Sequence, residues 1–467
     1  MYFVDINCIS WNFFSMFELL FKKPLKSLIS VVMKNLTKIM CLLLLACVSV
    51  NAQQEKGIIG TNNWLNGWAE FQPKAKDYGE PTQILTGNIT KDTKLTKRDT
   101  YLLLGSVFVT DSTTLTIEPG TVIIGDFKTN GSLIISKTSK IIAEGTVTDP
   151  IIFTSNRGFK KEGDWGGLFI LGNAPINKYG NASSVDYDLK PTSYENISYG
   201  GDNPKSNSGI LKYIRIEYAG KRTREHGYFN ALTLAGVGSK TTVENIMVSY
   251  CKGNSFNILG GNLSMEKLVS FRTNSNDFKF NFGTQSRISN SLAIRSPYVS
   301  GADGSRCMYI ASYDDKEEVD FTKPLTRVEA ENLTFINVSD DLKYDMSVGL
   351  VKEGIYVAKD AAIDISKSVI SGFKPAVIFD SRTKISSQSL DNLKFSNMYF
   401  NNCEGNLFLD NVSNNEDLEN WYGNRAFFNV YSKGSDAETF IDIKDPKKPD
   451  FRLRINKILA SSATLDD

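Results

Sequence analysis

The chain carries short runs of apolar residues, many of them β-branched or aromatic, separated by Gly, Asn, Asp and Ser. Apolar and polar residues alternate within these runs, and the three- and four-residue spacing of an amphipathic helix almost never persists. Such alternation places side chains on the two faces of a β-strand. The pattern therefore predicts an all-β protein.

A motif also recurs along the chain, in which an apolar-x-apolar segment follows Asn, Lys or Ser. Between the middle copies the period is roughly 22 to 24 residues, the length of one coil in a parallel β-helix. One coil cannot bury its inward side chains alone, so successive coils stack. We predict a single-stranded, right-handed parallel β-helix. The copies lie at residues 211–216, 243–248, 265–270, 288–294, 328–335, 363–370 and 393–400.

Asparagines stand just before several of the apolar strands, at Asn245, Asn290, Asn332 and Asn397. Asn tolerates the left-handed backbone conformation that a tight bend requires. Its side-chain amides can also hydrogen-bond from one coil to the next. We expect these residues at the bends between strands, with their amides stacked along the solenoid.

The pattern also sets boundaries. We predict coils over residues 99–460, interrupted at residues 177–208 by a polar segment without apolar period, expected to be a long loop leaving the stack. Residues 53–98 are expected to form an N-terminal cap, because the open end of a β-helix is an exposed sheet edge. The aromatic residues of this segment are expected to pack in the cap, with a platform for stacking carbohydrate as the alternative. They are Trp64, Trp68 and Phe71.

Residues 33–52 have the pattern of a secretory signal peptide, with Lys34 and Lys38 before an apolar stretch and cleavage after Ala52. The apolar stretch is too short to span a bilayer. Residues 1–32 precede this complete signal, so we expect them to be a mis-called extension. The alternative is an uncleaved anchor over residues 13–21.

Leu44 to Cys47 resembles a bacterial lipobox, in which the cysteine becomes a lipidated first residue. We favour the soluble form over lipidation at Cys47. Either form places the mature protein outside the cytoplasm, in the periplasm, at the outer membrane or outside the cell. Mass spectrometry of the mature N-terminus distinguishes the two forms.

The net charge and the content of cysteine and histidine limit which partners and sites the chain is expected to have. With Lys+Arg 53 against Asp+Glu 52, the net charge of +1 gives no field that attracts nucleic acid. Cys251, Cys307 and Cys403 follow the signal segment without forming a CxxC pair, so we expect buried small apolar residues with at most one disulfide. His226 is the only histidine and lies in a polar segment, where a surface loop is expected.

Ordered blocks over roughly residues 60 to 300 carry a resemblance to a known family. The sequence resembles cell-envelope β-helix proteins of the Bacteroidota, pectate-lyase-like solenoids that are often labelled transporters. The resemblance implies the fold and an exported location, and it implies no activity. The main blocks are LTIEPGT (115–121), IAEGT (142–146), PIIFTS (150–155), GDWGGL (163–168), LKYIRIEYAG (211–220) and SFNILGG (255–261).

The chain departs from its relatives at residues 274–283, where they carry an acidic run suited to Ca²⁺. Here Asp277 is the single carboxylate and Lys279 follows it, so we expect neither a Ca²⁺ site nor any other cofactor. Many relatives also end in a sorting domain for export across the outer membrane. The pattern is missing here, which weakens the expectation of surface display.

Parallel β-helices often cleave acidic polysaccharides with paired carboxylates or with Arg and Lys. Adjacent carboxylates in a strand point to opposite faces, so these groups are expected to be solvated loop charges, and we predict no catalytic residue. The polar clusters that come closest to such a set are Arg222, Arg224 and Glu225, and Asp314 with Asp315.

Three functions follow. We favour an exported noncatalytic protein that presents a lateral face to a polysaccharide or an envelope protein, which solenoid surfaces suit. The first alternative is a lyase or hydrolase acting on acidic glycans. The second is an accessory subunit of an outer-membrane uptake or assembly complex, without an integral membrane span of its own.

Overall fold

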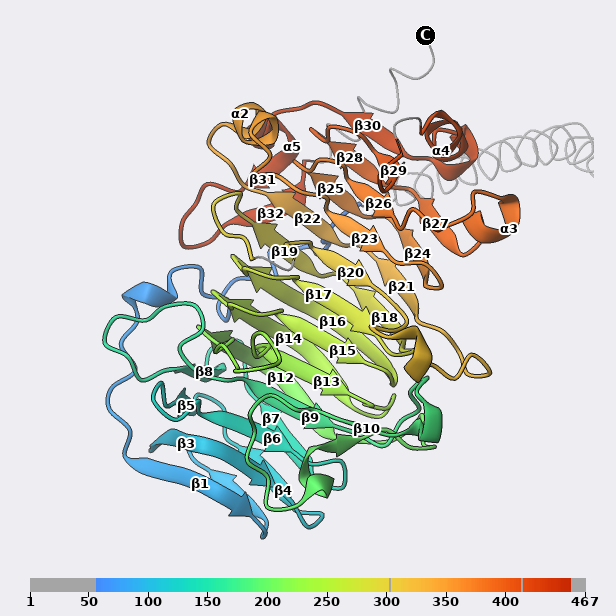
Figure 1. Cartoon of the computed structure of the whole chain (residues 1–467). Helices are drawn as coiled ribbons and strands as arrows, with labels where there is room; N and C mark the ends of the chain where they lie inside the picture. The colour runs from blue at the N-terminus through green and yellow to red at the C-terminus, as the bar shows by residue number, and fades with distance from the viewer. Residues whose placement is uncertain (1–55, 302–303, 413–414, 455–467) are drawn as a thin grey trace, which may run out of the picture. The chain divides into compact units, whose positions relative to one another are not determined.

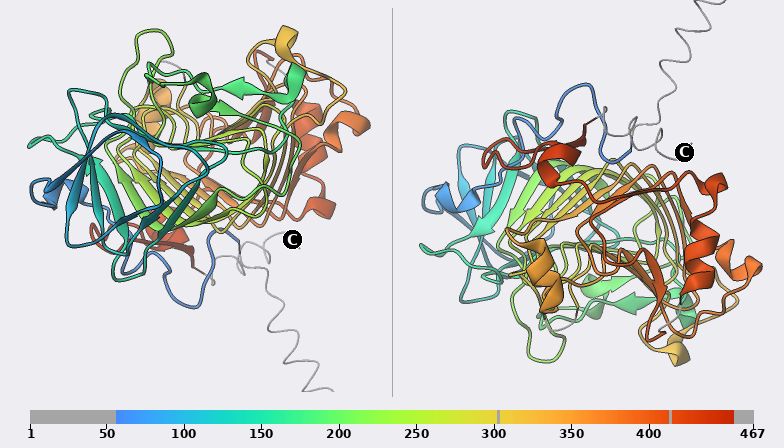
Figure 2. Two further views of the ribbon diagram at one scale, coloured as in Figure 1. Left: turned by 90° about the horizontal axis from the view of Figure 1, so that it is seen from below. Right: turned by 90° about the horizontal axis from the view of Figure 1, so that it is seen from above.

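The recurring motif folds into coils whose strands join one 28-stranded sheet with parallel pairing. The computed structural model describes residues 56–301, 304–412 and 415–454. Coils stack from β1 at one end to β30 at the other (Figure 1). Viewed along the stack, they enclose a common interior (Figure 2). The predicted right-handed parallel β-helix is confirmed. The predicted signal peptide, the upstream extension and Cys47 lie outside the described residues.

The coils build three lateral faces, A, B and C, in chain order. Face A contains β2 (Thr93–Leu95), β4 (Thr114–Ile117), β7 (Lys140–Glu144), the first parts of β12 (Gly209–Glu217), β14 (Thr242–Ser249) and β16 (Asn262–Phe271), then β18 (Gln285–Ser289), β21 (Arg327–Glu331), β24 (Ala362–Ser366) and β27 (Leu393–Ser396).

Face B continues from face A around one corner. It contains the first parts of β1 (Gln83–Ile89) and β3 (Thr100–Val109), β5 (Val122–Gly125), β8 (Ile151–Ser155), the second parts of β12, β14 and β16, then β19 (Leu292–Arg295), β22 (Thr334–Asn337), β25 (Val369–Ser371), β28 (Tyr399–Asn401) and β30 (Val430–Ser432).

Face C completes each coil. It contains the second parts of β1 and β3, β6 (Ser132–Ile135), β9 (Leu168–Leu171), β13 (Leu232–Ala235), β15 (Phe256–Leu259), β17 (Phe278–Asn281), β20 (Met308–Ile310), β23 (Ile355–Val357), β26 (Val377–Phe379) and β29 (Leu407–Leu409). Among the described residues the stack runs from Gln83 to Ser432, so the coils begin before the predicted residue 99, and the predicted end at residue 460 lies outside the described residues.

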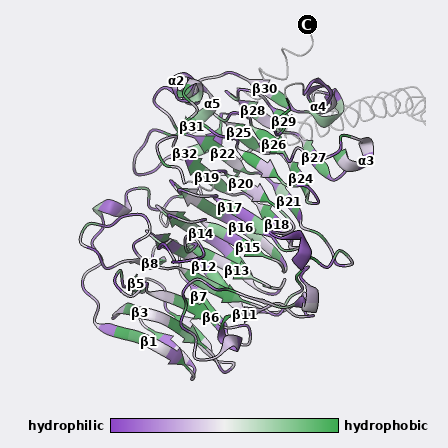
Figure 3. Ribbon diagram, viewed as in Figure 1, coloured by the Kyte–Doolittle hydropathy of each residue, from purple (hydrophilic) through white to green (hydrophobic). Residues whose placement is uncertain are grey.

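Inward side chains form ladders that fill the interior. Phe256 stacks on Phe278 with ring centroids 5.2 Å apart, and both rings are fully buried. Strands about 4.8 Å apart bring equivalent residues of successive coils into direct contact. Hydrophobic residues accordingly concentrate in the strands (Figure 3).

From β12 onward, the corner between faces A and B contains a single residue in the left-handed conformation, whereas the first coils have longer turns there. The φ angle of this residue lies at 52° in Asn245, 45° in Asn290, 56° in Asn332 and 54° in Asn397, which confirms the expected conformation of these asparagines. The expected amide stacking is found at other positions. Asn254 donates to Asn230 Oδ1 (2.7 Å) and accepts from Asn276 Nδ2 (2.9 Å), at the corner between faces B and C.

An N-terminal strap, residues 56–78, runs along the outer side of face B. Its successive residues bond to successively earlier coils, so it is antiparallel to the stacking direction. The bonds run from Gly57 N to Lys367 O (2.8 Å), from Ile58 N to Thr334 Oγ1 (2.9 Å) and from Ile59 N to Asn290 Oδ1 (2.9 Å). Residues 56–78 of the predicted cap thus cover a lateral face, whereas β1 and β2, from the same predicted segment, lie at the N-terminal end of the stack.

Aromatic residues fix the strap to outward side chains of face B. Trp68, 1% exposed, packs edge-on against Tyr213 (5.9 Å) and stacks with Trp64 (6.2 Å). Phe71 packs edge-on against Phe271 (5.3 Å). Trp68 is enclosed by the strap and face B, which argues against a carbohydrate platform at this residue.

The C-terminal hairpin covers the remaining part of face B. Its strands β31 (Phe440–Asp442) and β32 (Asp450–Leu453) are antiparallel. Phe440, Phe451 and Leu453 join the same apolar cluster as the strap. Face B is consequently buried on both sides over much of its length.

Residues 177–208 were predicted to leave the stack as a long loop. Instead, they fold back over the lower part of face C. The strands β10 (Ser183–Ser184) and β11 (Ser198–Tyr199) pair within this insertion. Buried Val185, Ile197 and Tyr199 pack with outward residues of face C. The apolar residues of this segment are few and irregularly spaced, so its sequence shows no period.

Short helices lie in the segments that precede, connect or follow the strands. They are η1 (Pro73–Ala75), η2 (Tyr179–Asn181), η3 (Tyr194–Ile197), η4 (Lys316–Glu318), α2 (Leu342–Ser347), α3 (Ser387–Leu390), α4 (Glu416–Tyr422), η5 (Arg425–Phe427) and α5 (Asp436–Thr439). Within the described ranges, no helix is long and apolar enough to cross a membrane.

Candidate functional site

The upper part of face C is the lateral surface that presents aromatic side chains to solvent. In β20, β23 and β26 the two inward residues are buried and the central outward residue is half-buried. Face B and lower face C are covered by the strap, the hairpin and the insertion. Face A instead carries exposed ion pairs such as Arg287 with Glu329.

Two tyrosines and an arginine form the centre of this surface, which we call the tyrosine ladder (Tyr309, Tyr356 and Arg306). Tyr309 and Tyr356 are paired in register on β20 and β23. Their rings stack with centroids 5.3 Å apart and planes 6° apart. The Arg306 guanidinium lies 4.9 Å from the Tyr356 ring centre and 5.7 Å from that of Tyr309, a cation–π arrangement.

Charged groups flank the ladder at its edges. Arg306 Nε donates to Glu353 (2.5 Å), and Lys279 Nζ lies 5.7 Å from the Tyr309 ring centre and 3.9 Å from Asp314. Tyr356 donates its hydroxyl proton to Asp380 (3.3 Å). Lys279, Tyr309 and Tyr356 thus form one column along the solenoid axis, and the guanidinium and carboxylate groups lie at its edges.

Asp380, beside the ladder, is held in its charged form. Hydrogen bonds from Arg382 lower the pKa of Asp380 to about 2. Burial, reinforced by the Asp380 charge, raises the pKa of Tyr356 to about 12. A general acid needs a pKa near the working pH, so this arrangement suits binding better than proton transfer.

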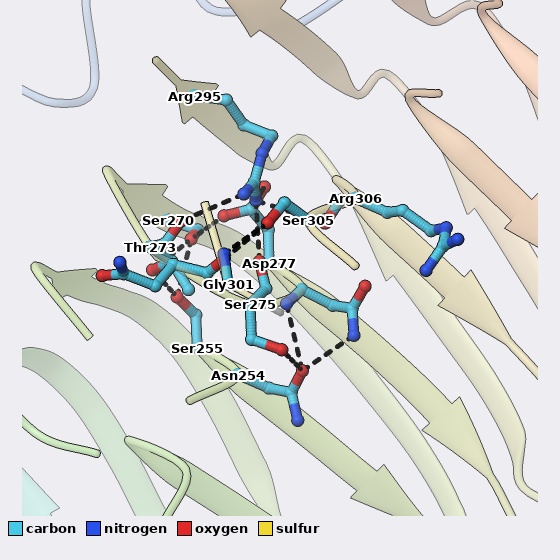
Figure 4. Close-up of polar contacts among 12 residues, drawn as sticks. Asn254, Ser255, Ser270, Thr273, Ser275, Asp277, Arg295, Gly301, Ser305 and Arg306 are labelled. Carbon is cyan, nitrogen blue, oxygen red and sulfur yellow. Dashed lines mark hydrogen bonds and ion pairs between the residues drawn. The ribbon is translucent and has the colours of Figure 1, made fainter. Parts of the chain in front are cut away.

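A buried polar network holds the loop that positions Arg306 (Figure 4). Asp277 accepts from Ser270 (2.5 Å) and from Arg295 Nη1 (2.8 Å), and the side chains of Asp277 and Arg295 are 0% and 4% exposed. The Arg306 carbonyl accepts from the Asp277 amide (2.9 Å). Arg306 therefore joins the buried network through its backbone and the tyrosine ladder through its side chain.

Asp277, the single carboxylate of residues 274–283, lies at the centre of this network. Burial raises the pKa of Asp277, against the opposing effect of the Arg295 charge. Both Asp277 oxygens are committed to protein donors, which fits poorly with a cation ligand. Among the described residues, no group of three His, Cys, Asp or Glu side chains could hold a metal ion.

Asp314 and Asp315 do not act as a pair. Asp314 accepts from Asn281 (2.8 Å) at the edge of the tyrosine ladder, whereas Asp315 accepts from the Glu317 amide (2.9 Å) at the start of η4. The two carboxylates thus serve separate local structures.

The second polar cluster lies in the turn between faces B and C, beside the insertion. Arg222 pairs with Tyr228 in an isolated bridge, and the Arg224 amide donates to Asp188 (2.7 Å). Glu225 is exposed, and His226 lies 3.8 Å from Asp186 with its side chain 41% exposed. These contacts of the turn are made within it and with the insertion, and none of them involves a residue of the tyrosine ladder. This fits the surface loop expected around His226.

The cysteines behave as small apolar groups. Cys251 and Cys307 are buried, Cys403 is partly buried, and none of these three forms a disulfide. Burial raises the pKa of Cys251 to about 12 and that of Cys403 to about 11.

A second cluster joins the strap to face B at its lower end. Glu217 accepts from Tyr78 (2.9 Å) and Thr154 (3.0 Å), and Arg215 donates to the Tyr78 hydroxyl (3.1 Å). Burial raises the pKa of Glu217 to about 7. Tyr78 and Thr154 also line a pocket of about 450 Å³, together with Arg157. The pKa of the buried Glu217 carboxyl thus lies near neutrality.

The sequence reasoning missed Tyr309, Tyr356 and Arg306. A weak signal was present, because Met308–Ile310 and Ile355–Val357 both place a tyrosine between two apolar residues. Long turns separate the two strands, so the register that stacks their rings could not be read from the regular period.

The fold and this surface define the class of single-stranded parallel β-helix proteins with an open aromatic lateral face. Residues 87–439 match the family model of the pectate-lyase like beta helix domain, and the chain belongs to this family. The Bacteroidota affiliation stays a prediction.

A comparison with solved structures finds similarity to PfbA, a surface adhesin of Streptococcus pneumoniae. The identity is 9%, the match covers 77% of this chain and 75% of that chain, and the TM-score is 0.28. No curated protein matches the sequence.

Proposed function

We propose that the protein is an exported, noncatalytic β-helix that binds a linear polysaccharide along the upper part of face C. The tyrosine ladder carries this proposal. Its rings and charged groups follow the solenoid axis with the repeat of the coils, about 4.8 Å. A linear polymer can therefore contact Lys279, Tyr309 and Tyr356 on three successive coils.

The chemistry of the ladder supports a sugar ligand. Tyr356, Arg306 and Lys279 supply donors, Asp314 and nearby carboxylates supply acceptors, and the ring edges supply apolar contact. Carbohydrate sites combine apolar aromatic contact with a few directed polar groups. Export in a Bacteroidota envelope, and periplasmic or surface location, remain parts of the proposal drawn from the sequence.

Glycan-array screening followed by calorimetry with the best oligosaccharide tests the proposal. Tyr309→Phe/Tyr356→Phe keeps the stacked rings and removes both hydroxyls, whereas Arg306→Gln removes the charge above them. We expect each variant to weaken binding by about ten-fold, equivalent to about 1.4 kcal/mol.

A matched control is Arg287→Gln, which removes an ion-paired arginine from face A. It is expected to leave affinity unchanged. Equal losses in Arg287→Gln and Arg306→Gln, or no glycan binding across the array, would contradict this assignment.

Cleavage of acidic glycans is a second candidate, supported by the Tyr78–Glu217 cluster. A carboxyl with a pKa of about 7 beside a pocket has the properties of a general acid or base. Turnover of uronic-acid glycans, followed at 235 nm or by reducing ends, is then expected to disappear in Glu217→Gln and Tyr78→Phe. Absence of turnover across the panel would reject this candidate.

A further inference from the structure

A pocket outside both sites lies between the strap and the C-terminal hairpin on the outer side of face B. Its volume is about 930 Å³, within the range of small-molecule sites. Phe71 of the strap and Phe451 of the hairpin form its walls, and outward residues of face B form its floor. The floor consists of Tyr250, Phe271, Ile294 and Val338.

The pocket floor is long and apolar. Phe271 and Ile294 are partners in register, and backbone bonds link Tyr250 to Phe271 and Val338 to the residue after Ile294. The four floor residues thus come from four successive coils. Three steps of about 4.8 Å give a floor of about 14 Å along the axis.

Two cations converge on the lower end of this floor. Lys74 Nζ lies 4.8 Å from the Tyr250 ring centre, and the Arg272 guanidinium lies 5.3 Å from that of Phe271. Neither cation has an ion-pair partner among the described residues. Arg272 hydrogen-bonds Tyr250, but the positive charges of both residues are not neutralised by a carboxylate and can attract an anionic group that enters the pocket.

The upper end has the opposite character. Asp340, Asp436 and Asp445 line the rest of the pocket with Lys444 and Arg295, and the charge of Arg295 is already paired with Asp277, so negative charge is in excess there. Burial raises the pKa of Asp436, against the effect of the Lys444 charge. A second anion at this end of a ligand would be repelled.

We propose that this pocket binds an amphipathic monoanion, a free small molecule with one anionic head group and an extended apolar or aromatic body. The head group meets Lys74 and Arg272, and the body lies along Phe271, Ile294 and Val338. This site is separate from the tyrosine ladder and does not depend on glycan binding.

Fluorescence of 8-anilinonaphthalene-1-sulfonate, itself an aromatic monoanion, tests the site in the full chain. We expect bound dye to be displaced by decanoate. Decylammonium, which reverses the head-group charge, and sebacate, which adds a second carboxylate, are expected to compete at least about ten-fold more weakly. Calorimetry with decanoate gives the affinity directly.

Variants locate the binding. Arg272→Asn and Lys74→Gln are expected to raise the Kd of decanoate about ten-fold each, while Arg222→Asn, in the distant turn, serves as a matched control. Val338→Trp fills the floor and is expected to abolish binding. The two surface variants decide the question if Val338→Trp fails to fold by circular dichroism.

Three outcomes would overturn the proposal. They are equal competition by decylammonium, an unchanged Kd in both Arg272→Asn and Lys74→Gln, and unchanged binding in a folded Val338→Trp protein. If the wild-type protein binds decanoate but no glycan, the function proposed for the tyrosine ladder is rejected and the proposal for this pocket stands.

Discussion

Removing Arg295 is expected to expose the energetic role of the buried network. In Arg295→Met the carboxylate of Asp277 loses its ion-pair partner inside a fully buried environment, since the two side chains are 4% and 0% exposed. Methionine keeps an unbranched side chain of similar length. The substitution therefore removes charge and hydrogen bonds with little change in volume.

The structure sets the size of the effect. Breaking one partner of a buried ion pair costs about 3–5 kcal/mol, because an uncompensated charge remains. Arg295 Nη1 also donates to the Ser275 carbonyl (2.9 Å) and Nη2 to that of Thr273 (3.1 Å), so two backbone acceptors lose a donor. We expect a free energy of unfolding lower by about 4 kcal/mol at pH 7.

The stability loss of Arg295→Met is also expected to depend on pH. Burial already raises the pKa of Asp277, and loss of Arg295 raises it further. A carboxyl whose folded pKa exceeds its unfolded value destabilises the fold increasingly as the pH rises above the unfolded value. The deficit of Arg295→Met is therefore expected to be largest at pH 7 and smaller near pH 4.

Urea unfolding followed by circular dichroism and by tryptophan fluorescence measures the loss, with coincident transitions as the test of cooperativity. Arg287→Met is the matched control, since Arg287 is 70% exposed in its pair with Glu329 and should contribute under about 1 kcal/mol. The double variant Asp277→Leu/Arg295→Met is expected to recover stability. A loss below about 1 kcal/mol in Arg295→Met, or no recovery in the double variant, would refute this account.

Three further predictions concern the strap, the Glu217 cluster and the thiols. Trp68→Ala is expected to lower the unfolding free energy by about 3–5 kcal/mol and Trp64→Ala by clearly less, as measured by urea unfolding, because Trp68 is the fully buried ring. Since burial raises the pKa of Glu217 to about 7, wild-type stability should fall by about 3 kcal/mol as the pH rises from 4.5 to 7, and Glu217→Gln should remove that fall. A thiol reagent with mass-spectrometric mapping should leave Cys251 and Cys307 unmodified in the native protein, because burial raises the pKa of both thiols, and should label them in urea. Equal losses for the two tryptophans, a pH profile unchanged by Glu217→Gln, or rapid native labelling would each contradict the corresponding contact.

Part of the fold could be predicted from the sequence, because the residues that determine it act locally. Asn245, Asn290, Asn332 and Asn397 predicted left-handed bends, since the conformation depends on the residue's own backbone energetics, and the bends are there. The insertion at residues 177–208 was recognised by its polarity. Its packing onto face C could not be predicted, because Val185 and Tyr199 follow no periodic spacing.

The candidate sites were much less accessible to sequence reasoning. Asp314 was singled out for a carboxylate pair that does not exist, and it lies instead at the edge of the tyrosine ladder. Tyr309 and Tyr356 are 47 positions apart in the chain, and only parallel pairing of β20 and β23 stacks their rings. The irregular turn between them hides that register from any fixed repeat.

By itself the sequence determined the stacked coils, because alternation and a period of roughly 22 to 24 residues are properties of neighbouring positions. Tertiary structure alone decided which faces are open. Residues 56–78 lacked any signal of direction, and their aromatic rings found partners on face B only once the coils had stacked. That covering leaves the upper part of face C free, and the contacts responsible join residues hundreds of positions apart, such as Ile59 and Asn290.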